Sequence, residues 1–182
     1  MVWQQHIISK QDLAIAVQEH GDKNGPVVLA LHGWRDNSAG FKPLAEALPN
    51  LRILAMDFPG HGLSANRHPQ ADYAIWSYLS DVLAVLDKLV TGPCILLGHS
   101  MGGAVAILFA ALYPERVAKL VLLDAIGPFV TPPAEVPAQM LSAMQMLRTR
   151  KLNYRHHYSD MASAVLARAN KGLSEAAAIL FA

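Results

Sequence analysis

The stretch Ile95-Leu96-Leu97-Gly98-His99-Ser100-Met101-Gly102-Gly103 places a serine between two apolar runs, with a glycine two positions away on either side. The run that ends at Leu97 has the continuous apolar pattern of a strand buried on both faces, and the run that begins at Met101 is typical of an apolar helix. A strand that passes directly into a helix holds Ser100 on a sharp, strained turn. Gly98 and Gly102 are required there because a Cβ atom would collide with the neighbouring backbone.

This turn predicts a nucleophilic role for Ser100. The helix that begins behind the serine directs its first N–H groups towards any anion that forms beside the hydroxyl. The pattern Gly-x-Ser-x-Gly is specific for an exposed nucleophile when it lies inside a strand-turn-helix. The alternative is a glycine-rich strand exit in which the serine side chain caps the helix.

Apolar patterns alternate between strand and helix on both sides of this turn. Strands are expected at residues 3–9, 13–19, 27–31, 51–56, 94–97 and 119–123, the first two joined as a hairpin. Helices are expected at residues 41–48, 75–90, 101–112, 138–148, 159–170 and 174–182. Strands and helices that alternate at this spacing form βαβ units. We therefore expect an α/β fold with a mostly parallel sheet and helices on both faces.

The composition excludes several classes of protein. Of the 182 residues, 53 % are hydrophobic and 16 % are charged, which is enough apolar surface for a sizeable core. The net charge of +1 leaves no basic field for a nucleic acid or an anionic membrane. A single cysteine, Cys94, excludes a disulfide framework and a cysteine-based metal site, and no cofactor is expected. Neither a secretory signal nor a membrane span is evident, so we expect a cytoplasmic protein that acts on a small molecule.

The segment Leu29-Ala30-Leu31-His32-Gly33-Trp34 also ends a buried strand. An acyl-transfer site needs two backbone donors aimed at the developing oxyanion. The N–H of Met101, directly after Ser100, is one candidate, and the N–H of Trp34 is the natural second. The alternative is an ordinary strand exit with His32 hydrogen-bonded in the loop.

A third loop, Asp57-Phe58-Pro59-Gly60-His61-Gly62-Leu63-Ser64, follows the strand that ends at Met56. Proline and glycine fix a tight turn. Asp57 and Ser64 are expected to accept hydrogen bonds from backbone donors inside this loop. We interpret the loop as structural, with His61 a loop residue rather than a base.

These three segments, in this order, resemble the α/β-hydrolase superfamily, and in particular its serine-hydrolase-like group. The passage from Tyr113 to Asp124 is similar to the family's helix-to-strand passage, and the resemblance covers residues 27–127 well. It implies that Ser100 is the nucleophile and that Met101 and Trp34 are the oxyanion donors. The implied reaction is attack of Ser100 on an ester-like carbonyl, an acyl-enzyme, and hydrolysis by water.

Two further chemistries stay open. Hydrolysis of a C–C bond, or another hydrolase reaction on the same fold, would share Ser100. A non-catalytic binding fragment would keep the pocket without an acid–base pair. A dehalogenase or an epoxide hydrolase is disfavoured, because those enzymes carry a carboxylate where this chain has Ser100.

This chain departs from the family's pattern at the positions of the catalytic acid and the catalytic histidine. The family places them after later strands, has eight strands where six are counted here, and inserts a helical cap over the site. Asp124 is a candidate acid because some members place theirs there, although a loop-capping role is the stronger interpretation. Among the candidate bases, His99 should point away from Ser100, His32 matches a loop-supporting position, and His156 and His157 are expected to be exposed.

We therefore expect residues 1–127 to form the hydrolase core, and residues 128–182 to form a cap segment truncated at the C-terminus. Without its base such a chain should be inactive or weak, whether as a fragment or as a truncated product. The strand at 119–123 would leave a hydrophobic sheet edge unpaired, which predicts self-association. Apolar residues of the cap suit a hydrophobic substrate group, although burial between cap helices is the better interpretation: Met140, Leu141, Met144, Met146 and Leu147.

Overall fold

The computed structural model describes residues 3–127, 130–149, 158–170 and 172–181. Contacts divide the chain into two compact units, the first up to residue 128 and the second from 129 to 180. Each unit is considered by itself. None of the helices within the described ranges has the length and apolar character needed to cross a membrane.

The first unit is built on a six-stranded sheet with the strand order β1-β2-β4-β3-β5-β6. The strands are β1 (Gln4–Lys10), β2 (Leu13–Gly21), β3 (Val27–Leu31), β4 (Arg52–Met56), β5 (Cys94–His99) and β6 (Val117–Leu123). The strands β4, β3, β5 and β6 run parallel, whereas β2 is antiparallel to both β1 and β4. The expected mostly parallel α/β sheet is thus confirmed.

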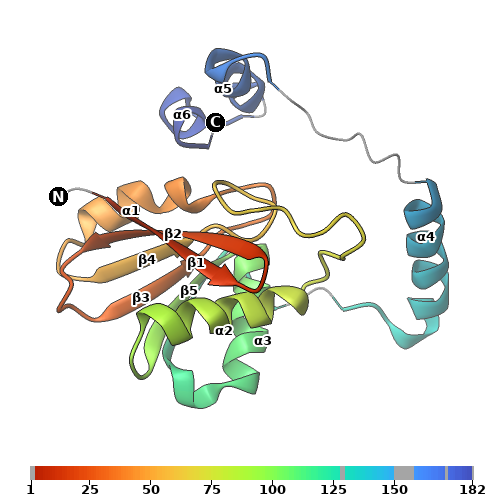
Figure 1. The fold of residues 1–182 in the computed structure, drawn as a ribbon. Coiled ribbons are helices and arrows are strands. Elements are labelled where there is room, and N and C mark those ends of the chain that lie inside the picture. Colours follow the sequence, from red (N-terminus) through yellow and green to blue (C-terminus); the bar gives the residue numbers. More distant parts are fainter. Residues whose placement is uncertain (1–2, 128–129, 150–157, 171, 182) are drawn as a thin grey trace. The chain divides into compact units, whose positions relative to one another are not determined.

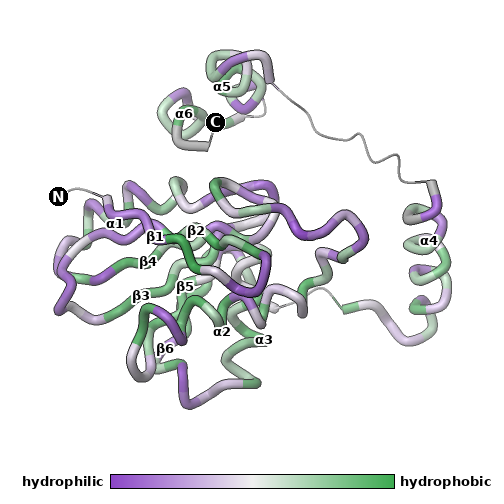
Figure 2. The backbone as a smooth tube through the Cα atoms, in the orientation of Figure 1, coloured by the Kyte–Doolittle hydropathy of each residue, from purple (hydrophilic) through white to green (hydrophobic). Residues whose placement is uncertain are grey.

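Helices cover both faces of this sheet (Figure 1). On one face α2 (Ser77–Leu89) and α3 (Met101–Leu112) pack against a cluster that includes Leu29, Leu54 and Leu96. The other face carries the short 3₁₀ helix η1 (Ser38–Phe41) and α1 (Lys42–Ala47), which pack against the strand residues of opposite parity. Because successive side chains of a strand point to opposite faces, β3, β4 and β5 must be apolar at nearly every position. Figure 2 shows this continuous hydrophobic colour along the central strands.

The strand β6 forms one edge of the sheet and is its most exposed strand. Leu120, Val121 and Leu123 are between 38 and 42 % exposed. The backbone N–H of Ser100 donates to the carbonyl of Leu123, so the polar backbone groups of Leu123 face β5. Since these groups alternate in direction along a strand, those of Leu120 and Leu122 face the open edge.

A buried carboxylate of α2 binds side chains from the β1–β2 hairpin and from the segment between β4 and α2. The side chain of Asp81 is fully buried and accepts from the Lys10 ammonium at 2.6 Å and from the Arg67 guanidinium. Arg67 also lies over the rings of Tyr73 and Tyr78. Burial raises the pKa of Tyr78 to about 12. This cluster fixes the segment between β4 and α2 against β1.

The second unit is helical, with η3 (Pro133–Glu135), α4 (Val136–Thr149), α5 (Met161–Ala169) and α6 (Glu175–Phe181). The helix α4 begins at Val136, ahead of Pro137, whereas the sequence predicted its start at residue 138. Proline is tolerated in a first turn because its missing N–H would have no partner there. The Asp160 side chain accepts from the N–H of Ser163 and so caps α5. The cap role expected for this unit stays a prediction.

Candidate functional site

The candidate site lies at the carboxyl ends of the parallel strands, where the strand order reverses. From β3 the chain first adds β4 on one side and then β5 on the other. In open α/β sheets the loops that follow two such strands leave a crevice that binds ligands. Gly33 follows β3 and Ser100 follows β5 at this position, and a Cβ built on Gly33 would lie 3.5 Å from the Cβ of Ser100.

Ser100 occupies the expected strand-turn-helix in a strained conformation. Its φ and ψ are 49° and −114°, outside the regions that side-chain-bearing residues favour. The residue is exposed, and its side chain makes no capping hydrogen bond to α3. The alternative interpretation, a serine that caps the helix, is therefore not supported. Strain of this kind persists only where the surrounding structure fixes it, here the bond from Ser100 N–H to the Leu123 carbonyl at 3.0 Å.

The glycines around Ser100 permit backbone contact on both sides of the turn. A Cβ on Gly98 would lie 2.5 Å from the carbonyl oxygen of Gly102. A Cβ on Gly102 would lie 2.1 Å from the carbonyl oxygen of Leu31, so α3 begins directly against the end of β3. Both distances are far shorter than any real Cβ contact, as the sequence predicts. Gly103 is equally constrained, because its Cβ would lie 2.3 Å from the Cβ of Ala125.

The N–H groups of Trp34 and Met101 remain available for an oxyanion. The Trp34 N–H has no hydrogen-bond partner within the described ranges, and Met101 holds the first helical position of α3, where an N–H has no partner inside the helix. The Trp34 ring packs edge-on against His61 with centroids 5.7 Å apart. The assignment of these donors stays a prediction.

His32 supports the loop after β3 and is unsuited to be the base. Its side chain is fully buried; Nδ1 donates to the Gly33 carbonyl at 2.7 Å and Nε2 accepts from the Phe58 N–H at 3.0 Å. Burial lowers its pKa to about 4. Both ring nitrogens are occupied in one neutral tautomer. Burial also lowers the pKa of His61, whose Nδ1 lies 3.3 Å from the Pro59 carbonyl oxygen.

Asp57 joins two loops rather than one. Its Oδ1 accepts from the Ser38 N–H at 2.6 Å and its Oδ2 accepts from the Leu63 N–H at 2.8 Å, with the residue only 1 % exposed. Ser64 donates to the Asp57 carbonyl and accepts from the Ala16 N–H of β2. The expected structural role of this loop agrees with these bonds, but they reach η1 and β2 outside the loop as well.

The position of Asp124 does not support the loop-capping role expected for it. It is exposed, has a φ of 50°, and directly follows the residue whose carbonyl accepts from Ser100. Its carboxylate makes no hydrogen bond to any residue in the described ranges, so the loop-capping interpretation is not supported. No histidine orients against it there either, and a role as the acid stays a prediction.

No general base stands at Ser100 within the described residues. The Ser100 hydroxyl has no hydrogen-bond partner among them, and His99, as expected, does not bond to it. His99 instead faces Asp36, with Nδ1 and Oδ2 3.9 Å apart. His156 and His157 lie outside the described residues.

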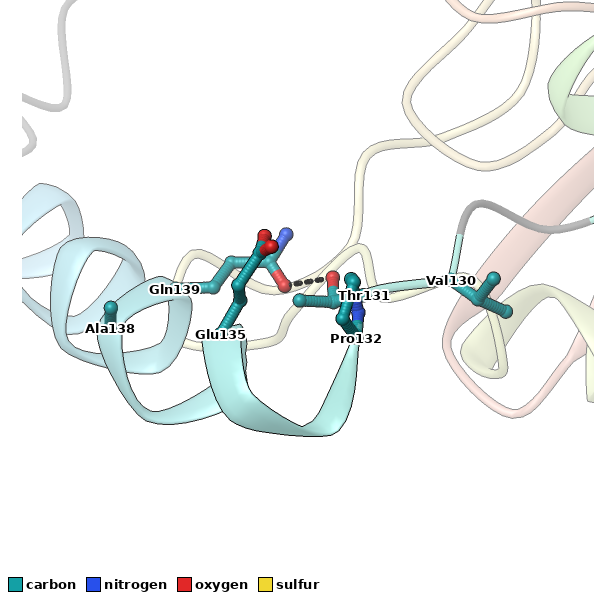
Figure 3. A pocket seen from close by; sticks show the side chains of 6 residues that line it. All are labelled: Val130, Thr131, Pro132, Glu135, Ala138 and Gln139. Atoms are coloured by element: carbon teal, nitrogen blue, oxygen red, sulfur yellow. Dashed lines mark hydrogen bonds between the residues drawn. The ribbon is translucent and has the colours of Figure 1, made fainter.

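The methionine-rich segment of α4 is exposed, and its burial between cap helices stays a prediction. Four side chains are between 58 and 70 % exposed: Met140, Leu141, Met144 and Met146. The side chain of Leu147 lies outside the description. A hollow of about 330 Å³ lies where the chain enters α4, with Thr131 bonded to Gln139 across it (Figure 3). Its lining includes Val130, Glu135 and Ala138, and neither a serine nor a histidine is among the residues described there.

Sequence reasoning missed Asp36 and the contact between Gly103 and Ala125. Asp36 accepts from the Asn37 N–H at 2.6 Å, and the Asn37 side chain caps η1. The signal was the run Asp36-Asn37-Ser38, since such residues start helices. The close approach at Gly103 follows from the second glycine after Ser100, which the Gly-x-Ser-x-Gly pattern does not require.

Two curated proteins show how far the similarity extends. A protein from Danio rerio named serine hydrolase-like protein is 50 % identical over 111 residues, which are 60 % of this chain and 34 % of that protein. A lipase from Mycobacterium tuberculosis, LipV, is 41 % identical over 108 residues, or 59 % of this chain and 40 % of the lipase. The chain thus spans about a third of the length of the first of these relatives and two fifths of the second.

The structural similarity covers nearly the whole chain. A hypothetical protein from Pseudomonas aeruginosa PAO1 superposes with a TM-score of 0.87 and 38 % identity, covering 98 % of this chain and 64 % of that one. The family described as the alpha/beta hydrolase fold matches residues 26–163. That match includes four strands and the residues that follow them: Trp34, Asp57, Ser100 and Asp124. The chain belongs to the α/β hydrolase fold family.

Proposed function

We propose that this chain is a serine hydrolase that cleaves small ester-like substrates through an acyl-enzyme on Ser100. The observation that carries the proposal is the conformation of Ser100, exposed and strained at φ 49° without capping the helix behind it. A serine with only a structural role would form the capping bond and relax the backbone. The name of the Danio rerio relative and that of the lipase support hydrolysis, without extending to a substrate.

In the proposed reaction the Ser100 Oγ attacks the carbonyl carbon while its proton passes to a base. The resulting oxyanion accepts hydrogen bonds from the N–H groups of Met101 and Trp34. The tetrahedral intermediate then collapses, and the alcohol leaves with a proton. Water attacks the acyl group in a second round through the same oxyanion site and regenerates Ser100.

We further propose that the 182-residue chain turns over slowly, because none of the described histidines is bonded to Ser100. An oxyanion site without a base retains about 10³–10⁴-fold acceleration over water. Activated reagents that need little help from a base should therefore still react. This makes covalent capture a better readout than steady-state turnover.

A fluorophosphonate probe tests the proposal. Ser100 Oγ attacks phosphorus, the P–F bond breaks, fluoride leaves and the hydroxyl proton passes to water. We expect one equivalent of label on the peptide that contains Ser100, and none on Ser100→Ala. Ser142→Ala, which removes a serine of α4, is the matched control and should label like the parent.

Absence of label on folded parent protein would instead favour the non-catalytic binding fragment. The tryptophan emission of the first unit reports folding, since all three tryptophans precede residue 128. An enzyme of the same fold that hydrolyses C–C bonds would also be labelled at Ser100 by the probe. Parallel assays with p-nitrophenyl acetate and a β-diketone distinguish that chemistry from ester cleavage.

A further inference from the structure

His99 is the last residue of β5, and its side chain lies against the loop that carries the proposed oxyanion donor. A Cβ built on Gly33 would lie 3.0 Å from Nδ1 and 3.2 Å from Cε1 of His99. Gly33 itself is buried, and Trp34 follows it directly. The imidazole therefore lies against the Gly33 backbone, between this loop and the turn at Ser100.

The loop after β3 needs such support because it is strained. Arg35 has a φ of 60°, a left-handed conformation that is unfavourable for a residue other than glycine. The Asp36 N–H reaches back to the Gly33 carbonyl at a long 3.3 Å. Stronger bonds lie on either side of this segment, at His32 and at Asn37. Trp34 and Arg35 thus lie between two fixed points.

Asp36 brings a second contact from the same loop to His99. One carboxylate oxygen accepts from the Asn37 N–H at 2.6 Å, and the other lies 3.9 Å from the His99 Nδ1. The carboxylate therefore links the start of η1 to the imidazole. Both groups that approach the ring do so at Nδ1 rather than at Nε2.

We infer that His99 is a positioning residue that holds the Gly33–Trp34 backbone, and with it the Trp34 N–H, at the distance from Ser100 that an oxyanion requires. The inference rests on the proposed function, since the Trp34 N–H has a role only if an oxyanion forms. His99 does not touch the reacting atoms. It acts through the Nδ1 side of its ring.

The test compares four variants by the kinetics of fluorophosphonate inactivation. His99→Ala should lower the maximal inactivation rate about tenfold and leave the half-saturating probe concentration unchanged, since a displaced donor weakens the transition state more than binding. His99→Asn keeps a polar atom where Nδ1 lies and should retain the rate within about threefold. His99→Gln places its amide nearer the Nε2 position and should resemble His99→Ala. His68→Ala, at an exposed histidine, should match the parent.

Gly33→Ala provides an independent check. Its Cβ would press on the His99 ring and move the loop, so the single variant should also slow inactivation. Combined with His99→Ala the new methyl group has room, and the double variant should be faster than the product of the single effects predicts.

The outcomes separate the inference from the proposed function. Equal maximal rates for parent, His99→Ala and His99→Asn, with label on Ser100, would overturn the inference and leave the proposed function standing. If the rate reductions caused by Gly33→Ala and His99→Ala simply multiply in the double variant, the two residues do not interact, and this result would also overturn the inference. If the folded parent takes no label at all, the proposed function fails and the inference fails with it. A lower labelled fraction at an unchanged rate would show a folding defect, and would count against positioning.

Discussion

Asp57 and Ser100 each follow a parallel strand at the same end of the sheet, yet they differ in burial, in backbone strain and in hydrogen bonding. Asp57 is buried, and both carboxylate oxygens accept from backbone N–H groups. Ser100 is exposed, strained and without a partner for its hydroxyl among the described residues. Polar groups that stabilise a fold have their bonds completed by the protein. A polar group held strained and unpaired is instead available to a ligand.

The largest effect is expected at Asp57. Asp57→Ala leaves the buried N–H group of Ser38 and the N–H group of Leu63 without their acceptor, and should lower the free energy of unfolding by about 3 kcal/mol. Urea unfolding followed by tryptophan emission measures the change. Asp87→Ala, which removes an exposed ion pair with Arg116, should cost less than about 1 kcal/mol. Equal losses in the two variants would mean that burial does not distinguish Asp57. If Asp57→Ala does not fold, Asp57→Asn gives the same ranking.

A similar loss is expected from acidification, through His32. Its pKa is about 4 in the folded chain and about 6.5 when unfolded, so the unfolded chain binds more protons between these values. Stability should therefore fall as the pH drops from 6.5 to 4, by roughly 3 kcal/mol in total, and be constant above pH 7.5. His61, whose pKa is also lowered, adds in the same direction.

The pH dependence of the unfolding free energy in His32→Asn should be much flatter than in the parent. A parent chain with equal stability at pH 4.5 and 7.5 would contradict the buried neutral imidazole. Direct detection of a proton on Nδ1 of His32 by NMR at pH 6 checks the tautomer without a variant.

Two glycine substitutions compare the cost of a steric clash with the cost of an unfavourable backbone conformation. Gly102→Ala places a methyl group 2.1 Å from the Leu31 carbonyl oxygen, and should destabilise the first unit by about 2–3 kcal/mol. Gly92→Ala meets nothing within 4 Å but must adopt a φ of 83°, and should cost about 1 kcal/mol. A larger loss at Gly92 than at Gly102 would mean that the turn at Ser100 is not tightly packed.

Ser100→Gly should increase the unfolding free energy, whereas the preceding substitutions decrease it. Glycine adopts positive φ without strain, so this variant should gain about 1 kcal/mol in unfolding free energy while it loses all fluorophosphonate labelling. Ser100→Ala keeps the strain and should lose the label with no gain in stability. A destabilised Ser100→Gly would show that Ser100 contributes to the fold as Asp57 does.

The smallest effect is expected at the open edge of the sheet. We propose that the exposed apolar side chains of β6, together with its backbone edge that no other described strand pairs with, promote weak self-association. Leu120→Lys should lower the associated fraction several-fold in sedimentation velocity. The same substitution at Leu112, which is 63 % exposed at the end of α3, should change it little. Equal effects would assign the association to general hydrophobicity.

The elements that apolar patterns define best could be predicted from the sequence. The predicted bounds of β3 and α3 match the structure, because a turn residue or a proline ends each apolar run. The start of β6 was predicted at Lys119, whereas the strand begins at Val117, since a strand on an edge has a weaker apolar pattern.

Contacts between distant residues were beyond the sequence. Lys10 and Asp81 are 71 positions apart, and no local pattern indicates that they meet. The pairing of Asp36 with His99 likewise depends on β3 and β5 being neighbours in the sheet. The role of Asp57 was predicted correctly in kind, but its reach to Ser38 needed the tertiary structure.

If Ser100 accepts an acyl group, that group can be trapped on its hydroxyl. The chain is mixed with p-nitrophenyl acetate, quenched in acid within seconds and digested for peptide mass spectrometry. We expect an acetyl group on Ser100 in the parent, and none at position 100 in Ser100→Ala. Acetylation confined to surface lysines, with Ser100 unmodified in folded protein, would contradict it.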